Sequence, residues 1–135
     1  MGPNDVELDR IYPREAGTVV EDITLETGSN FEVAVEGEVG TALFGTGGNF
    51  TVAILIRDLT ANSSVIHTAN VASNFGAAWA TVKQEFPFTV PAATIAGREN
   101  HILEAVAVLS AGGVGPANPP DVSFVRSRLF TVHAP

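Results

Sequence analysis

The stretch Asn49–Leu59, "NFTVAILIRDL", decides the fold. As a β-strand it places two sets of side chains on opposite faces: Phe50, Val52, Ile54 and Ile56 on one, and Thr51, Ala53, Leu55 and Arg57 on the other. Both sets are largely apolar, whereas a strand with one face in water alternates more cleanly. The stretch therefore predicts a strand in a layered β-structure, and it raises the question of what covers its second face.

The rest of the chain shows the same period-two alternation between turn signals, and no segment shows sustained helical periodicity. Seven principal strands are predicted, at residues 18–26, 31–39, 49–59, 64–71, 81–90, 101–109 and 122–132. Pro87 predicts an edge strand or a bulge, and the alternation slips near Arg126, which predicts a second bulge. Short strands at this spacing predict an all-β fold, namely an immunoglobulin-like β-sandwich of about seven antiparallel strands in two sheets. The third, sixth and seventh strands are expected in one sheet, and a jelly roll is the alternative topology.

The strand pattern also predicts the core and the domain limits. Eight side chains are expected to line a common core: Val33, Val35, Val52, Ile54, Phe86, Phe88, Leu103 and Ala105. Residues 17–135 are expected to form the sandwich domain. Residues 1–16 are expected to form a polar amino-terminal arm, with an edge piece around residues 6–11.

Length, cysteine count and charge exclude several classes of protein. A chain of 135 residues fits one domain, and the absence of Cys excludes disulfides, thiol chemistry and Cys-based zinc sites. The net charge of −8 argues against a nucleic-acid partner. The acidic start lacks a secretory signal and no run is long enough to span a membrane, so the chain is expected to be made in the cytoplasm, or to be extracellular if a signal has been removed.

The charges are unevenly distributed. Residues 1–40 hold ten of the fifteen acids and two of the seven bases. Glu32, Glu36 and Glu38 share the outer face of the second strand, while Arg126 and Arg128 share a face of the last strand. We expect one of two arrangements: the acidic face of one copy meets the arginine edge of the next, or the arginines pair within the chain or face water.

Motifs for catalysis, cofactors or metals are weak. The glycine-rich "FGTGGNF" (residues 44–50) lacks the Walker lysine and is interpreted as a turn. His67, His101 and His133 have no metal-ligand spacing, and no nucleophile elbow is present. Phe75 and Trp79 are the candidates for a sugar-stacking platform, but core or loop positions are favoured for both. We therefore expect no enzyme activity and neither cofactor nor metal.

The stretches "SNFEVAVEGEVG", "GGNFTVAILIRD", "FPFTVPAATIAGRENHILEAVAVL" and "SRLFTVHAP" resemble the Cys-free immunoglobulin-like modules of bacteria and their phages, including adhesion-type repeats of the CARDB sort. The resemblance implies a non-catalytic structural or interaction module. A component of a larger assembly such as a phage virion, in a capsid decoration or tail role, is the favoured interpretation. A carbohydrate- or ligand-binding domain of a secreted or surface protein, using the loops at one end, is the alternative.

The two-faced strands predict where a protein partner docks. Leu55, Ile102 and Val106, on the outer side of the third and sixth strands, are expected to be buried against another copy, another domain or the amino-terminal arm. The chain is accordingly expected to be a homo-oligomer or an assembly subunit, with no membrane partner.

Overall fold

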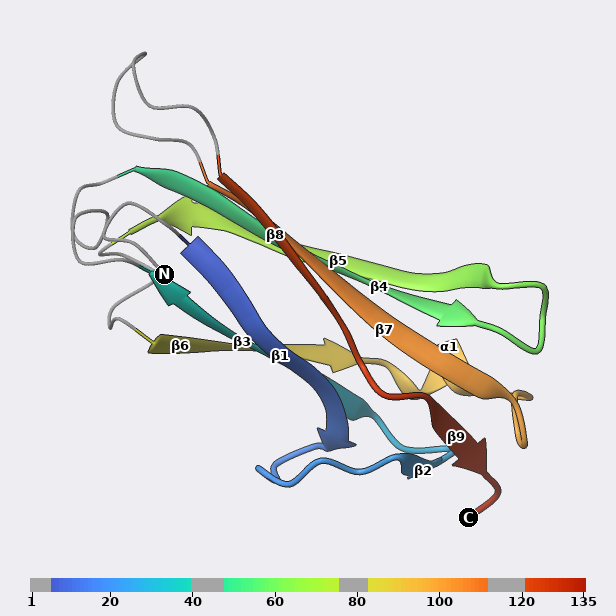
Figure 1. Cartoon of the computed structure of the whole chain (residues 1–135). Coiled ribbons are helices and arrows are strands. Elements are labelled where there is room, and N and C mark those ends of the chain that lie inside the picture. Colours follow the sequence, from blue (N-terminus) through green and yellow to red (C-terminus); the bar gives the residue numbers. More distant parts are fainter. Residues whose placement is uncertain (1–5, 40–47, 76–82, 112–120) are drawn as a thin grey trace.

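A computed structural model describes residues 6–39, 48–75, 83–111 and 121–135 of the chain (Figure 1). Within these ranges it forms nine strands and one short helix. They are β1 (Val6–Glu15), β2 (Thr24–Glu26), β3 (Phe31–Val39), β4 (Asn49–Asp58), β5 (Ser64–Asn74), β6 (Lys83–Val90), α1 (Ala92–Ile95), β7 (Ile102–Ala111), β8 (Asp121–Arg126) and β9 (Phe130–His133).

The strands form two sheets packed face to face. One sheet has three strands in the order β1-β3-β6, and the other has six, in the order β2-β9-β7-β4-β5 with β8 beside β7. Neighbouring strands are antiparallel except β2 and β9, which are parallel. This is the predicted all-β, immunoglobulin-like sandwich, and the predicted third, sixth and seventh strands do share one sheet.

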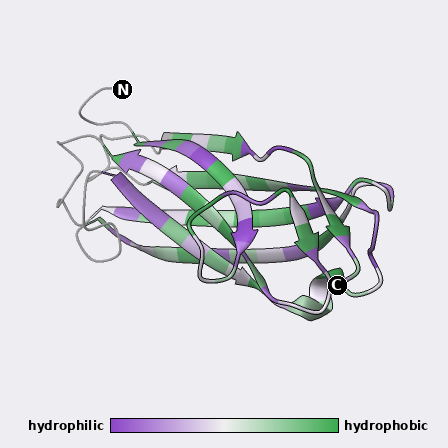
Figure 2. Cartoon of the chain, turned by 90° about the horizontal axis from the view of Figure 1, so that it is seen from below, coloured by the Kyte–Doolittle hydropathy of each residue, from purple (hydrophilic) through white to green (hydrophobic). Residues whose placement is uncertain are grey.

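The core lies between the sheets and contains all eight predicted side chains. The inward face of β4 is buried, with Val52 and Ile56 fully excluded from solvent. Phe50 packs its ring 5.2 Å from that of Phe75 and 5.7 Å from that of Phe86. Alternating apolar and polar residues are visible along the strands in Figure 2.

The amino-terminal segment is more ordered than the sequence suggests. The edge piece predicted around residues 6–11 is present, but it extends to Glu15 as the edge strand β1, which pairs with β3 along its whole length and buries Val6, Leu8 and Ile11. The register shifts between Leu8 and Arg10, so an extra residue, Asp9, interrupts the alternation. That bulge places Leu8 and Ile11, three residues apart, on the same inward side and hides the strand from a period-two search.

The predicted strand at residues 18–26 is mostly irregular. Only β2 pairs, and Val19 and Val20 are 80% and 71% exposed. Gly17, at φ +83°, adopts a conformation that favours glycine and turns the chain after β1. The alternation in this segment therefore reflects composition rather than sheet pairing.

The two irregularities predicted in later strands are present. Pro87 lies in β6, an edge strand of the three-stranded sheet. The last predicted strand is broken after Arg126 into β8 and β9, and the backbone N–H of Ser127 donates to the carbonyl of Ala105 at 2.8 Å across the break. The phase slip thus marks an interruption larger than a single bulge, and it raises the strand count above seven.

Candidate interaction surface

The outer face of the six-stranded sheet carries a block of apolar side chains in lateral register. Cross-strand partners point to the same side of a sheet. Ala53 of β4 pairs with Val108 of β7, which pairs with Phe124 of β8, and Leu55 and Val106 form the next row. We call six residues the outer strip: Ala53, Leu55, Val106, Val108, Val122 and Phe124.

The outer strip is partly open to solvent. Val108, Phe124 and Val122 are 40%, 58% and 63% exposed, whereas Val106 is almost buried by its neighbours in the sheet. The expectation that the amino-terminal arm covers this face is wrong for residues 6–15, because β1 belongs to the opposite sheet. In the part of the chain that the structure describes, the second face of β4 is shielded only from the sides, by β5 and β7.

Charged residues border the outer strip at one end. Arg57 of β4 pairs in register with Glu104 of β7, and Glu104 forms an ion pair with Arg126 of β8 at 3.6 Å. The Nε atom of Arg57 is buried and has no hydrogen-bond partner among the described residues. The strip therefore has an apolar centre and a polar margin that retains an unused donor.

The outer face of the three-stranded sheet is covered by its own side chains. The guanidinium of Arg10 lies 3.9 Å from the ring centroid of Tyr12, which is only 2% exposed. Arg14, also buried, donates from Nε to Glu32 at 3.0 Å and from Nη1 and Nη2 to Glu85 at 2.9 and 3.3 Å. Burial alone would lower the pKa of Arg14, but its hydrogen bonds to Glu85, Glu32 and Tyr12 raise it, so the arginine stays charged.

A shallow acidic cleft of about 480 Å³ lies at the other end of this face. Asp9 at the β1 bulge faces Glu38, which forms an ion pair with Lys83 at 3.4 Å. Partial burial, a hydrogen bond to Glu38 and the charges of Glu38 and Glu7 raise the pKa of Asp9 to about 6, while Lys83 lowers it. The cleft therefore repels anions.

The arginines and acids predicted to meet between copies also have partners within the chain. Arg126 pairs with Glu104, and Arg128 lies 3.9 Å from Glu21. Glu32 and Glu38 pair with Arg14 and Lys83, whereas Glu36 lines the acidic cleft. Arg126 and Arg128 do not share a strand face, because β8 ends at Arg126. The predicted contact between copies stays a prediction.

A buried charge cluster fixes the end of β4. Asp58 is fully buried, and its Oδ2 lies 2.6 Å from both Arg98 Nη1 and His101 Nδ1. Its Oδ1 accepts from the backbone N–H of Ala61 at 3.1 Å. Burial alone would raise the pKa of Asp58, but the hydrogen bonds from His101, Arg98 and Ala61 lower it overall. This cluster ties β4 to the segment that precedes β7, which is a structural role.

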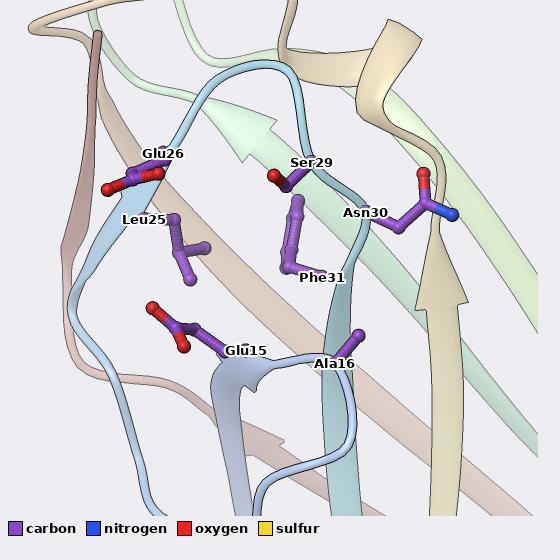
Figure 3. Close-up of a pocket in the computed structure, with 7 residues that line it drawn as sticks. All are labelled: Glu15, Ala16, Leu25, Glu26, Ser29, Asn30 and Phe31. Carbon is purple, nitrogen blue, oxygen red and sulfur yellow. The ribbon is translucent and has the colours of Figure 1, made fainter. Parts of the chain in front are cut away.

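A small cleft of about 290 Å³ lies at one end of the sandwich, between the ends of β1 and β2 and the start of β3 (Figure 3). Leu25 and Phe31 line it together with the carboxylates of Glu15 and Glu26. The side-chain oxygen of Asn30, Oδ1, already accepts a hydrogen bond from the backbone N–H of Ala92 at 2.9 Å. The cleft is polar and acidic.

The remaining residues considered for ligand binding lie either in the core or outside the described residues. Phe75 is buried in the core, whereas Trp79 and most of the glycine-rich loop lie outside the described residues. Among the described residues no cluster of three or more His, Asp or Glu side chains is placed to hold a metal ion. The described part also contains no helix long and apolar enough to cross a membrane.

Of the three predicted docking residues, Leu55 and Val106 belong to the outer strip, whereas Ile102 lies at the start of β7 and is 41% exposed. The prediction missed Val108, Val122 and Phe124. Their signal was present, because Val122 and Phe124 alternate with Ser123. That pattern would normally place the apolar residues inside. Instead, Ser123 faces inward, where its Oγ accepts from the backbone N–H of Leu8 at 3.0 Å.

Comparison with known proteins shows the fold alone. No protein-family profile and no curated protein matches the sequence. The crystal structure of the C-terminal domain of Wzt is similar over the whole of this chain and 77% of that chain, with 13% identity and a TM-score of 0.61. A CARDB domain from Pyrococcus furiosus, solved in complex with di-metal ions, matches 95% of this chain and 85% of that chain, with 12% identity and a TM-score of 0.45. A β-glucosidase from Listeria innocua matches 93% of this chain and 16% of that chain, with 14% identity and a TM-score of 0.42.

Proposed function

We propose that this β-sandwich is a non-catalytic interaction module, that it acts as a component of a larger protein assembly, and that it docks on a neighbouring protein through the outer strip. The observation that carries the proposal is the exposure of Val108, Val122 and Phe124 in one block. Clustered apolar side chains on a folded surface are a feature of sites where proteins associate.

The composition of the surface favours a protein as its partner. An aromatic and several aliphatic side chains lie at the centre, and Arg57, Glu104 and Arg126 lie at the margin. Protein interfaces have this arrangement of an apolar centre and a polar rim, and arginine is enriched in them.

The more specific role, a capsid decoration or tail component of a phage virion, rests on the sequence resemblance. The surplus of acids suits a protein that binds neither nucleic acid nor an anionic membrane surface. On the three-stranded sheet, Arg14 already forms hydrogen bonds with Glu32 and Glu85 of the same chain, so these side chains need no partner from another protein. The six-stranded sheet then remains as the docking side.

A second candidate is ligand binding at one end of the sandwich, as in the carbohydrate- or ligand-binding alternative. The specific observation in its favour is the cleft beside Leu25 and Phe31, with the carboxylates of Glu15 and Glu26 as hydrogen-bond acceptors for hydroxyl groups. Binding of soluble glycans that is lost in Glu15→Ala/Glu26→Ala but kept in Phe124→Ser would favour this candidate over assembly.

The assembly proposal is tested by co-expressing the chain with the products of its neighbouring genes and isolating particles by sedimentation. The wild type should enter a particle visible by electron microscopy, and Phe124→Ser should be depleted from it at least about tenfold. Thr89→Ser, an exposed position on β6 of the opposite sheet, is the matched control and should enter normally. Equal incorporation of Phe124→Ser and wild type, or no particle with either, would contradict the proposal.

A further inference from the structure

The four sheet edges of the sandwich differ in how they are protected. A free edge presents unpaired backbone groups to other chains, and proteins block it with short strands, charges, proline or a covering segment. β1 packs against β8, with Leu8 N–H donating to Ser123, and β2 has only three residues. β6 carries Lys83, Glu85 and Pro87.

β5 has much less protection. It is the terminal strand of the six-stranded sheet and, at eleven residues, the longest described strand. Its sequence "SVIHTANVASN" contains no Lys, Arg, Asp, Glu or Pro. A register shift leaves Ile66 as a bulge at one end, so the regular part runs over residues 67–74. Burial lowers the pKa of His67, which leaves this part uncharged at neutral pH.

Among the described residues, the backbone groups on the outward edge of β5 have no partner strand. Residues 67–74 pair with β4 on one side, and no other described segment pairs with them. In an antiparallel pair, alternate residues direct their N–H and C=O groups away from the partner strand. About half of the backbone groups of this segment are therefore free to bind another strand.

We propose that the β5 edge is a self-association site, at which two copies of the chain pair their β5 strands antiparallel about a two-fold axis. The two six-stranded sheets then continue into one another. A strand paired with itself in this way makes an isologous contact that closes as a dimer.

The side chains and charges favour a second copy as the occupant. Thr68, Asn70 and Ala72 are exposed on the same side as the outer strip. An axis that passes through a residue of β5 places these three opposite one another, so small and uncharged groups meet. Two chains of net charge −8 repel each other at most surfaces, but the nearest acid on β4, Asp58, is buried and paired. The edge thus lets backbone pairing proceed without like charges opposite one another.

The site lies on a different element from the outer-strip residues, so the two proposals can fail separately. Sedimentation velocity over a range of protein concentrations should show a monomer–dimer equilibrium for the wild type. Thr68→Lys/Asn70→Lys should raise the dissociation constant at least about tenfold, because the added charges face each other across the axis. Thr89→Lys/Ala96→Lys adds the same charge at exposed positions away from β5 and should leave the dimer intact.

The absence of Cys from the chain allows a direct check of the geometry. Single variants Thr68→Cys, Asn70→Cys and Ala72→Cys are oxidised in turn, with Thr89→Cys as the control. Disulfide-linked dimers should form at the one or two β5 positions nearest the axis, where the Cα atoms come within about 7 Å, and not at the control.

Three results would overturn the inference. They are a monomer at every concentration, a dimer unaffected by Thr68→Lys/Asn70→Lys, or equal cross-linking at the control. A dimer that is dissociated by Phe124→Ser but unaffected by the β5 variant would place self-association on the outer strip, which supports the proposed docking surface while rejecting this site. A β5 edge that pairs only with a strand from another protein would give monomers in all these experiments.

Discussion

The outer faces of the two sheets differ in how far their apolar side chains are covered. On the three-stranded sheet Tyr12 lies beneath Arg10 and beside Arg14, and the carboxylates of Glu32 and Glu85 bind the buried guanidinium of Arg14. On the six-stranded sheet Val108, Val122 and Phe124 are 40%, 63% and 58% exposed.

Local charge explains the difference. β1 supplies Arg10 and Arg14, and the acids that bind Arg14 come from β3 (Glu32) and β6 (Glu85), so this part of the small face forms its ion pairs within the chain. β4, β7 and β8 supply mainly aliphatic residues at the outward positions, and their few charges gather at one end. The outer face of the three-stranded sheet, whose charged groups pair within the chain, needs no partner. The outer face of the six-stranded sheet, with its exposed apolar side chains, is suited to bind one.

The largest expected effect tests the boundary between core and outer face, which runs between neighbouring residues of β4. Ile54 is 3% exposed and points inward, whereas Leu55 lies on the outer strip. Ile54→Ala should lower the free energy of unfolding by roughly 2 to 5 kcal/mol because it leaves a cavity. Leu55→Ala should cost about 1 kcal/mol. Chemical denaturation measures both, and equal costs would show that the outer strip belongs to the core.

The second effect belongs to the self-covered face. Arg14→Ala removes a buried guanidinium and the hydrogen bonds that it donates to Glu32 and Glu85. The expected loss is about 2 kcal/mol, below the range for fully buried pairs because Glu85 is 38% exposed. Arg10→Ala is the matched control on the same strand, and its half-exposed side chain should contribute less than about 1 kcal/mol. If the two variants lose the same stability, the Arg14 network does not hold this face together.

How far the sequence predicts these features depends on how local their causes are. The core positions Val33 and Ile54 follow from alternation within single strands, and they were correct. β1 was underestimated because the bulge at Asp9 changes the spacing of its inward residues. No local pattern marks such a shift, since it is set by pairing with β3.

The contacts between distant segments were not predictable. Arg14 meets partners 18 and 71 residues away, and Asp58 meets Arg98 and His101 40 and 43 residues away. The sequence alone places Arg14 in the polar amino-terminal arm and says nothing about which carboxylates will face it. Two of the six outer-strip residues were predicted, for the same reason: Leu55 is recognisable on its own strand, whereas the outward side of Phe124 depends on its pairing with Val108 of β7.

The third effect concerns pH at the acidic end of the three-stranded sheet. Because the pKa of Asp9 is raised from 3.8 to about 6 in the folded chain, its protonated form stabilises the fold. This contribution is complete below about pH 4 and is lost as the pH rises to about 6. Asp9→Asn should remove that loss and raise the free energy of unfolding at pH 7. The gain should be no more than about 1 kcal/mol, because Asp9 is only partly buried and solvent screens its interactions with Glu38, Glu7 and Lys83.

Denaturant midpoints measured from pH 4 to pH 7 test the role of Asp9. Glu26→Gln is the control, because it removes an acid from β2 of the other sheet. The wild type and Glu26→Gln should both lose stability over this range, and Asp9→Asn should lose less. An unchanged pH profile in Asp9→Asn would show that the acidic cleft does not titrate through Asp9.

The smallest effect on stability is expected where the effect on assembly is largest. Phe124 is 58% exposed, so Phe124→Ser gives up less than half of the burial that a core phenylalanine contributes and should cost less than about 1 kcal/mol. Phe88→Ser makes the same chemical change at a side chain that is 9% exposed and should cost about 3 kcal/mol or more. Thermal and chemical unfolding measure this contrast without any partner. Equal losses would mean that Phe124 is held by the fold rather than presented to solvent, and the contrast between the two outer faces would then fail at its most exposed aromatic residue.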